Sequence, residues 1–65
     1  MIKTMTELLE LKKKALICMG KHKQALGGVW EHGEPDQAWY DADNVFCVKY
    51  QDGTWWHYGN NGEWW

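Results

Sequence analysis

Two cysteines and three histidines are the side chains of this sequence best suited to metal binding. They are Cys18, Cys47, His22, His32 and His57. Thiolate and imidazole groups are the usual protein ligands of zinc, but structural zinc sites commonly supply them in close pairs such as CxxC. The spacing here is irregular, so the sequence predicts no metal site. Two cysteines 29 positions apart are instead typical of free thiols in apolar surroundings.

Catalytic chemistry has few candidate residues. The sequence contains no serine and no arginine, which excludes serine nucleophiles and arginine clamps. It also contains no glycine-rich phosphate loop of the GxxxxGKS/T or GxGxxG type. Its carboxylates are scattered over predicted turns, at Glu34, Asp36, Asp41, Asp43 and Asp52. No acid-base pair stands out, so we expect a protein that is not an enzyme and needs no cofactor.

The elements that position these residues belong to a single small domain, residues 1–65. A chain of 65 residues buries only about 60% of the surface that its unfolded form exposes. The ten Phe, Trp and Tyr residues all lie between Trp30 and Trp65. Each such ring buries about 150 to 250 Å² when it is enclosed. We therefore expect aromatic rings to fill much of the core.

The N-terminal part predicts an amphipathic helix over residues 4–19. Its apolar side chains fall on one broad arc at about 100° per residue, and they are Leu8, Leu9, Leu11, Ala15, Leu16, Cys18 and Met19. Thr4 followed by Glu7 matches a capping box, with Thr6 as an alternative N-cap. We favour an end near Gly20, and the alternative is a longer helix that ends at Gly27-Gly28.

Residues 29–65 predict an antiparallel β-meander. The segments VWEH and QAWY flank GEPD, and the segments NVFCVKYQ and TWWHY flank the dipeptide Asp52-Gly53. Asp-Gly predicts a type I′ hairpin turn of two residues, which would pair Tyr50 with Trp55. The expected fold class is α+β, with one N-terminal amphipathic helix packed on three to five antiparallel strands.

Strand alternation assigns the side chains of the meander to two faces. The face expected beneath the helix carries Trp30, Trp39, Phe46, Val48, Tyr50, Trp55 and His57. The opposite face carries Tyr40, Val45, Cys47, Lys49, Trp56 and Tyr58, and no remaining segment covers it. This assignment separates Cys47 from His57 and from Cys18. It therefore argues against a shared metal site and against an intramolecular disulfide.

Charge is distributed unevenly along the chain. Residues 1–28 hold six Lys and two Glu, a net charge of +4, whereas residues 29–65 hold one Lys, four Asp and three Glu, a net charge of −6. The basic cluster is Lys12, Lys13, Lys14, Lys21 and Lys23. It lacks the arginine and interleaved aromatics of nucleic-acid-binding patches, so it predicts a solvated helix face. The acidic, aromatic half suits a partner with a basic surface.

An uncovered aromatic face with carboxylates around it predicts a protein-binding surface. Its expected residues are Tyr40, Asp41, Asp43, Val45, Trp56, Tyr58, Trp64 and Trp65. We expect a small inhibitor or adaptor that also forms a homodimer. By analogy of size and charge, it is similar to phage and mobile-element inhibitors of CRISPR or restriction enzymes, whose targets have basic nucleic-acid grooves. The alternative is a carbohydrate- or small-ligand-binding module that uses exposed Trp and Tyr rings as a stacking platform.

The C-terminal segment DGTWWHYGNNGEWW, residues 52–65, resembles a single unit of the choline-binding and related cell-wall repeats. Those proteins bury their surfaces by stacking several units, and this chain has one. We interpret the likeness as convergence on one hairpin geometry and carry over no ligand site. The sequence also shows no secretory signal and no run of about 20 apolar residues, so we expect a cytoplasmic protein that does not enter membranes.

Overall fold

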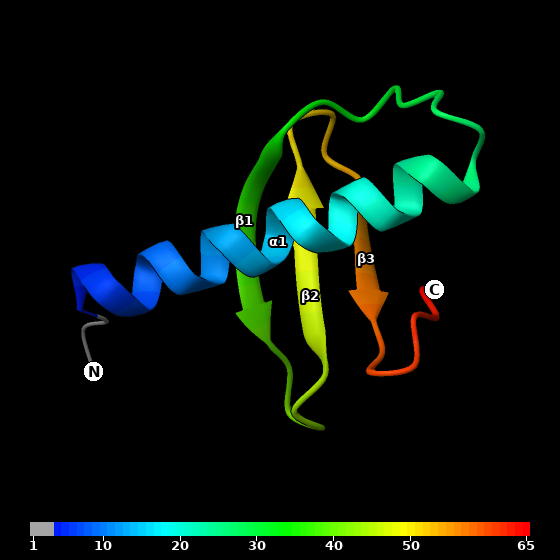
Figure 1. Cartoon of the computed structure of the whole chain (residues 1–65). Coiled ribbons are helices and arrows are strands. Elements are labelled where there is room, and N and C mark those ends of the chain that lie inside the picture. The colour runs from blue at the N-terminus through cyan, green and yellow to red at the C-terminus, as the bar shows by residue number, and fades with distance from the viewer. Residues whose placement is uncertain (1–3) are drawn as a thin grey trace.

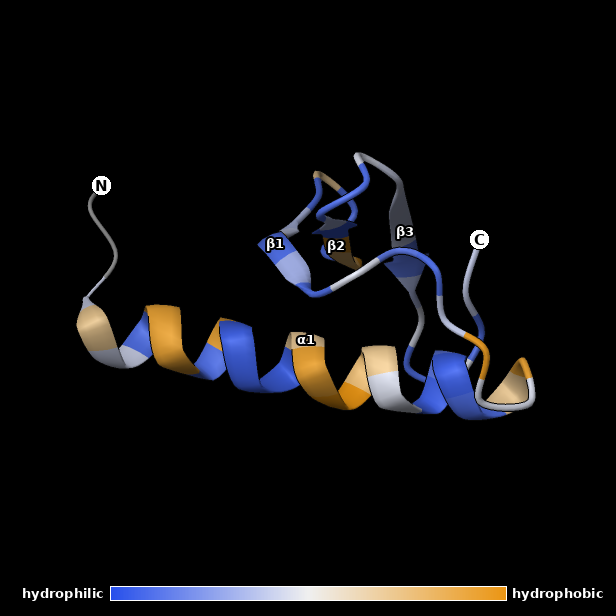
Figure 2. Cartoon of the chain, turned by 90° about the horizontal axis from the view of Figure 1, so that it is seen from above, coloured by the Kyte–Doolittle hydropathy of each residue, from blue (hydrophilic) through white to orange (hydrophobic). Residues whose placement is uncertain are grey.

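The computed structural model describes residues 4–65 as one helix, α1 (Met5–Ala25), and one antiparallel sheet of three strands. The strands are β1 (Pro35–Tyr40), β2 (Phe46–Tyr50) and β3 (Trp55–Tyr58), in the order β1-β2-β3. α1 crosses one face of the sheet (Figure 1), and the view from above shows it on that side alone (Figure 2). We call the side facing α1 the inner face and the other side the outer face. The predicted α+β class is confirmed.

α1 begins at the predicted N-cap, and the bond that the N-cap side chain makes in a capping box is present. Thr4 is the N-cap, and its hydroxyl accepts a hydrogen bond from the Glu7 backbone N–H at 3.2 Å. The same hydroxyl lies 3.3 Å from the Glu7 carboxylate and donates to it. One of the unpaired N–H groups of the first turn is thereby satisfied. Residues close in sequence are enough to define this end of the helix.

The end of α1 differs from the favoured prediction. The helix continues through Gly20 to Ala25, so an end near Gly20 is wrong and the alternative end at Gly27-Gly28 is correct. Gly27 and Gly28 have φ of 77° and 86°, and the Gly28 N–H donates to the Lys23 carbonyl at 2.9 Å. A left-handed backbone after the last turn is the common way to end a helix, and glycine adopts it without a steric penalty.

Gly20→Ala should therefore stabilise the protein by about 0.5 to 1 kcal/mol, because Gly20 is an exposed interior position of a helix with open space at its Cβ. Gly27→Ala is the matched control. It should destabilise the protein by about 1 kcal/mol, because alanine would have to adopt the left-handed conformation. Urea unfolding of both variants measures the two changes, and a loss of stability in Gly20→Ala would contradict the continuous helix.

Three hairpin turns with loops of three residues follow one another along the sheet. The residues that flank each loop are joined by a backbone N–H···O bond: Asp41 to Val45 at 3.0 Å, Tyr50 to Thr54 at 2.8 Å, and Gly59 to Glu63 at 2.9 Å. The third loop residue has positive φ in each case: Asn44 (61°), Gly53 (89°) and Gly62 (83°). This pattern matches a type I turn followed by a left-handed residue, the common form of a three-residue hairpin loop.

The expected two-residue turn at Asp52-Gly53 is therefore wrong. A type I′ turn needs positive φ at both residues, and only Gly53 has it. The Asp52 carboxylate accepts hydrogen bonds from the Thr54 N–H at 3.0 Å and the Thr54 hydroxyl at 2.6 Å. It also lies 2.6 Å from His32 Nδ1. The Thr54 bonds first, and His32 second, lower the pKa of Asp52 to about 2. These contacts hold Asp52 in the middle of the longer loop.

The longer loop shifts β3 by one residue relative to the expected pairing. Val48 lies opposite Trp56, and Cys47 lies opposite His57. Because strand side chains alternate, a shift of one residue turns every side chain of β3 to the other face. Trp56 and Tyr58 therefore lie on the inner face, where the core forms, and Trp55 and His57 lie on the outer face.

The loop between β1 and β2 has the same effect on β1. Trp39 lies opposite Cys47, and Tyr40 lies opposite Phe46. Trp39 is therefore on the outer face and Tyr40 on the inner face, the reverse of the expectation. The assignment of β2 itself is correct, because Phe46, Val48 and Tyr50 do form part of the core.

The expected strand at residues 29–32 does not form. Residues 29–34 instead lie along the turn between β2 and β3, where the Gln51 N–H donates to the Glu34 carbonyl at 3.1 Å. The Trp30 indole N–H donates to the Gly33 carbonyl at 2.8 Å, which curls the segment. Gly33 has φ of 80°, and a Cβ there would lie 2.7 Å from Gln51 Oε1. Trp30 still packs on the core, as expected.

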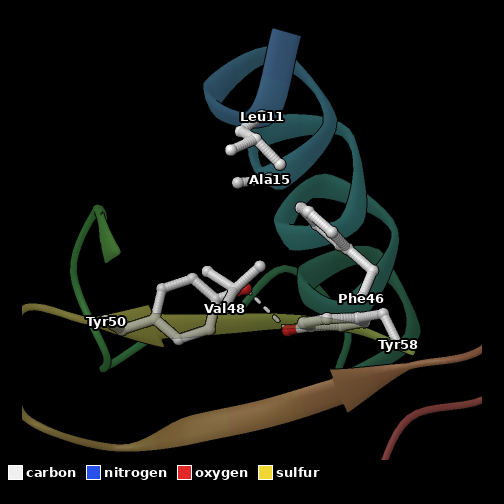
Figure 3. Close-up of a cluster of buried hydrophobic side chains, with 6 residues drawn as sticks. All are labelled: Leu11, Ala15, Phe46, Val48, Tyr50 and Tyr58. Atoms are coloured by element: carbon white, nitrogen blue, oxygen red, sulfur yellow. Dashed lines mark hydrogen bonds between the residues drawn. The ribbon is translucent and has the colours of Figure 1, made fainter. Parts of the chain in front are cut away.

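Six buried side chains form the centre of the core between α1 and the inner face (Figure 3): Leu11, Ala15, Phe46, Val48, Tyr50 and Tyr58. Partly buried neighbours pack around them: Cys18, Met19, Trp30, Ala38, Trp56 and Trp64. Aromatic rings thus supply most of the core volume, as the composition predicts. The hydroxyls of Tyr50 and Tyr58 are hydrogen-bonded at 2.6 Å within this core (Figure 3).

His22 connects the last turns of α1 to the same core. Its side chain is 1% exposed, and its Nδ1 is hydrogen-bonded to the Tyr58 hydroxyl at 2.9 Å. The surrounding rings have centroids 4.4 to 5.7 Å from that of His22, and they are Trp30, Trp56, Tyr58 and Trp64. A helix ending at Gly20 would remove His22 from this packing. Tertiary contacts therefore explain why α1 continues beyond the glycine.

The other leucines of the expected apolar arc of α1 are only partly buried. Leu8, Leu9 and Leu16 are 40% to 58% exposed. The 21 residues of α1 span about 31 Å at about 1.5 Å per residue, whereas the outer strands of a three-stranded sheet are about 10 Å apart. A helix that crosses so narrow a sheet must project beyond it, and the N-terminal turns of α1 extend past β1 (Figure 1).

The burial of His22 predicts a dependence of stability on pH. Burial first, and the charge of His32 second, lower the pKa of His22 from its ordinary value of 6.5. Below about pH 6.5 the unfolded chain therefore binds a proton at His22 more readily than the native state does, and stability decreases as the pH decreases. The loss should begin as the pH falls through about 6.5 and increase towards pH 5.5.

Urea unfolding at pH 7.5, 6.5 and 5.5 measures this loss. His22→Gln keeps a neutral hydrogen-bonding side chain and should flatten the decrease, whereas His32→Gln should retain it. An equal decrease in wild type and His22→Gln would contradict the assignment. The shift of Asp52 acts in a separate range, because a lowered carboxyl pKa makes stability decrease only as the pH falls from about 4 towards 2.

Candidate functional site

The outer face of the sheet carries the side chains best suited to binding or to chemistry. Trp39 of β1, Cys47 of β2 and His57 of β3 lie side by side, since Trp39 pairs with Cys47 and Cys47 with His57. Trp65 continues the line, because its backbone N–H and C=O bond to those of His57 at 3.2 and 2.9 Å. The expectation that Cys47 and His57 lie on opposite faces is wrong. It depended on the two-residue turn at Asp52-Gly53.

Four rings form a continuous aromatic row on this face: Trp39, Trp55, His57 and Trp65. The centroid distances are 5.7 Å for Trp39 to Trp55, 4.9 Å for Trp55 to His57, and 5.0 Å for His57 to Trp65. The last pair is stacked, with an interplanar angle of 1°. Trp55 and Trp65 are 51% and 54% exposed. Large exposed rings grouped on one face are typical of an interaction surface.

Three possible metal ligands, Asp41, Cys47 and His57, lie beside the aromatic row. Their ligand atoms are all within 4.8 Å of one another, and His57 Nε2 is 3.8 Å from Asp41 Oδ2. The other carboxylate oxygen, Asp41 Oδ1, accepts hydrogen bonds from the N–H groups of Asp43 and Val45, both at 2.9 Å. The turn after β1 therefore orients the Asp41 carboxylate towards the histidine.

The hydrogen bonds of His57 determine which ring nitrogen is available. His57 Nδ1 is 3.2 Å from the carbonyl oxygen of Trp65. A carbonyl oxygen can only accept, so Nδ1 carries the proton, and the lone pair of the neutral ring is on Nε2. In a cysteine or serine triad the acid and the nucleophile contact different nitrogens of the histidine. Here the acid lies beside Nε2 while Nδ1 bonds to backbone, so the geometry does not match a triad.

Both thiols are free, and both are in surroundings that favour the protonated form. Burial first, and the charge of Asp41 second, raise the pKa of the Cys47 thiol, which is fully buried. Burial also raises the pKa of Cys18, against the opposing charges of Lys14 and Lys21. A protonated thiol is a weak nucleophile, so neither cysteine has the surroundings of a catalytic cysteine.

The structure brings half of the predicted partner-binding residues to the outer side. Asp41 and Trp65 lie on the outer face, Val45 is half-buried beside Asp41, and Asp43 is exposed in the adjoining loop. These four remain candidates for partner contact.

The other four predicted residues lie towards α1, so their expected place on the uncovered face is wrong. Tyr58 is 6% exposed, and Trp56 and Trp64 pack on the core. The Tyr40 hydroxyl accepts a hydrogen bond from Lys14 Nζ at 2.9 Å. The cause is the one-residue change of register at each hairpin. Lys14, expected to be a solvated member of the basic cluster, is thus engaged with the inner face.

Sequence reasoning missed Trp39, Trp55, Cys47 and His57 as neighbours on one surface. A signal for them was present. The dipeptides Asp43-Asn44, Asp52-Gly53 and Asn61-Gly62 recur every nine residues, each followed two residues later by an aromatic residue. Equal spacing of like turns indicates one loop length throughout, and that length determines which side chains share a face.

Comparison with protein families, with curated proteins and with solved structures finds no match for this chain. Within residues 4–65, no helix has the length and apolar character needed to cross a membrane. The function must therefore be inferred from the outer face itself.

Trp55 and Trp56 are adjacent residues with opposite roles, which offers a direct test of the faces. Trp56→Ala should destabilise the protein by about 3 kcal/mol, because Trp56 packs on the core and against His22. Trp55→Ala should cost about 1 kcal/mol or less, since half of that side chain is exposed. Urea unfolding of the two variants measures both losses, and the reverse ranking would contradict the observed register.

Proposed function

We propose that this protein is a non-enzymatic inhibitor or adaptor whose outer face binds a basic surface of another protein, such as the nucleic-acid groove of an enzyme. The observation that carries this proposal is the aromatic row on the side of the sheet opposite to α1, with Trp55 and Trp65 half exposed. Large aromatic side chains at the centre of an interface supply much of its binding energy.

The aromatic row is held in place before any partner arrives. His57 is stacked on Trp65 and in contact with Trp55, and Trp55 is in contact with Trp39. Trp65 is itself fixed by two backbone hydrogen bonds to His57. Side chains that are ordered in the free protein lose little entropy on binding, so more of the contact energy remains as affinity.

The distribution of charge favours a basic partner. Asp41 lies on the outer face and Asp43 in the exposed loop beside it, within a half of the chain that carries a net charge of −6. Lys49 is the one lysine of that half, and it lies on the outer face opposite Trp55. The exposed lysines of α1 are on the other side of the sheet. Complementary fields of this kind mainly accelerate encounter with the partner.

The ring geometry favours a protein partner over a saccharide. Trp39 and Trp55 are inclined by 43°, and Trp55 and His57 by 50°, so these rings do not form one flat platform for an extended saccharide. Trp56, Tyr58 and Trp64, the expected stacking residues, pack towards α1.

The test compares capture of proteins by immobilised wild type and by the double variant Trp55→Ala, Trp65→Ala. Leu9→Ala, an exposed apolar position on α1, is the matched control. The proposal predicts a partner that wild type and Leu9→Ala both retain and that heparin or DNA displaces. The affinity of the double variant for this partner should be lower by at least about 30-fold. Asp41→Asn with Asp43→Asn should slow association with this partner severalfold and change dissociation less.

Two results would contradict the proposal. One is a partner that binds the double variant as well as wild type. The other is a shift of tryptophan fluorescence with saccharides or choline in wild type that the double variant lacks, which would assign the face to a small ligand. Sedimentation of the free protein shows separately whether a second copy occupies the aromatic row, and a stable dimer lost in the double variant would assign the face to self-association.

A further inference from the structure

The cluster of Asp41, Cys47 and His57 combines one carboxylate, one thiol and one imidazole, which are the three ligand types of protein zinc sites. We propose that these residues bind Zn²⁺ as three ligands, with a fourth position open to solvent on the outer face. The proposal does not depend on the proposed function, because it concerns the isolated chain and needs no partner.

The three ligand atoms are close to the positions that a tetrahedral ion requires. Zinc bonds of about 2.0 to 2.3 Å place neighbouring ligand atoms about 3.3 to 3.6 Å apart. His57 Nε2 and Asp41 Oδ2 are separated by 3.8 Å, and no pair in the cluster exceeds 4.8 Å. Small rotations of side chains on a fixed backbone would therefore bring the three atoms to bonding distance of one ion.

The backbone pairing accounts for this closeness. Both backbone polar groups of His57 bond outwards to Trp65, so His57 and Cys47 form a non-hydrogen-bonded pair of the antiparallel ladder. In such pairs the Cα atoms are only about 4.5 Å apart and the side chains are closer than in the alternate pairs. The strands thus bring the sulfur and the imidazole together without strain.

The hydrogen bonds around the three residues already orient His57 and Asp41 for a metal. A histidine that binds a metal usually donates its other N–H to a carbonyl or carboxylate, and His57 Nδ1 donates to the Trp65 carbonyl. Asp41 Oδ1 is held by the N–H groups of Asp43 and Val45, which leaves Oδ2 for the ion. Cys47 closes the inner side of the site, and the 26% and 27% exposure of His57 and Asp41 gives access from solvent.

The chemistry of binding is that of a thiolate site. The Cys47 S–H bond breaks, its proton goes to water, and the sulfur electron pair forms the S–Zn bond, with no change in oxidation state. His57 contributes its Nε2 lone pair and Asp41 its existing negative charge. One water molecule completes the tetrahedron.

Co²⁺ replaces Zn²⁺ in such sites and reports its ligands by absorption, so cobalt titration is the first test. Wild type should bind one Co²⁺ with a thiolate-to-cobalt band in the near ultraviolet and the visible bands of a four-coordinate ion, and Zn²⁺ should displace it. Zn²⁺ at a hundred times its dissociation constant should raise the Tm by roughly 10 to 20 °C.

The variants identify the ligands. Cys47→Ser should abolish the thiolate band, and His57→Gln and Asp41→Asn should each weaken Zn²⁺ binding at least about tenfold. Asp41→Asn is the mildest change, because its remaining oxygen can still accept the two loop hydrogen bonds. Cys18→Ser and His32→Gln are the matched controls and should bind as wild type, since Cys18 is on α1 and His32 Nδ1 is hydrogen-bonded to Asp52 and Thr54 instead of lying in the cluster.

A titration of wild type without the thiolate band would overturn the site, whatever the variants do. Unchanged affinity in Cys47→Ser, His57→Gln or Asp41→Asn would also overturn it, as would loss of the band in Cys18→Ser. Metal binding with failure to capture any partner would support this site and count against the proposed function alone, so the two failures can be distinguished.

Discussion

Loop length is the constraint on which the rest of this structure depends. Each hairpin closes over three residues, the third of which is left-handed at Asn44, Gly53 or Gly62. Because side chains alternate between the two faces along a strand, one residue more or less in a loop turns the side chains of the following strand to the opposite face. The loop between β2 and β3 thus decides that Trp56 and Tyr58 enter the core and that Trp55 and His57 do not, and the loop between β1 and β2 decides in the same way that Trp39 does not.

The polar contacts of the core follow from the same register. Tyr58 can meet His22 only because it lies on the inner face, and there its hydroxyl joins His22 Nδ1 to the hydroxyl of Tyr50. Burial raises the pKa of both tyrosines and lowers that of His22, so all three are neutral near pH 7. A neutral hydrogen-bonded series of side chains, in which each hydroxyl has a partner, costs little free energy to bury. It fixes the last turns of α1 against the sheet.

Features governed by neighbouring residues were predictable from the sequence. Thr4 and Glu7 predict the start of α1, and the β-forming segments predict β2, most of β3 and the α+β class. Features decided by competition between similar local geometries were not predictable from the sequence. Asp52-Gly53 fits both a two-residue and a three-residue loop, and contacts of Asp52 with Thr54 and with the distant His32 favour the longer one.

The candidate site was predictable only in part, for the same reason. Asp41, Asp43 and Trp65 were recognised as surface residues, but the pairing of Cys47 with His57 required the correct register. The end of α1 was also beyond local reasoning, since Gly20 remains helical because His22 packs in the core. The recurrence of like turns every nine residues was the one sequence signal that could have shown a common loop length.

The register of β2 and β3 can be measured directly by the NMR contacts between backbone Hα protons across the two strands. Such contacts are strong only between residues of non-hydrogen-bonded pairs. The Tyr50 N–H bond to Thr54 makes the next pair, Lys49 with Trp55, non-hydrogen-bonded, and the pair Cys47 with His57 follows it. The structure therefore predicts strong Hα contacts in these two pairs. Strong contacts between Tyr50 and Trp55 and between Val48 and His57 would instead show a two-residue turn. They would contradict the core, the aromatic row and the metal site together.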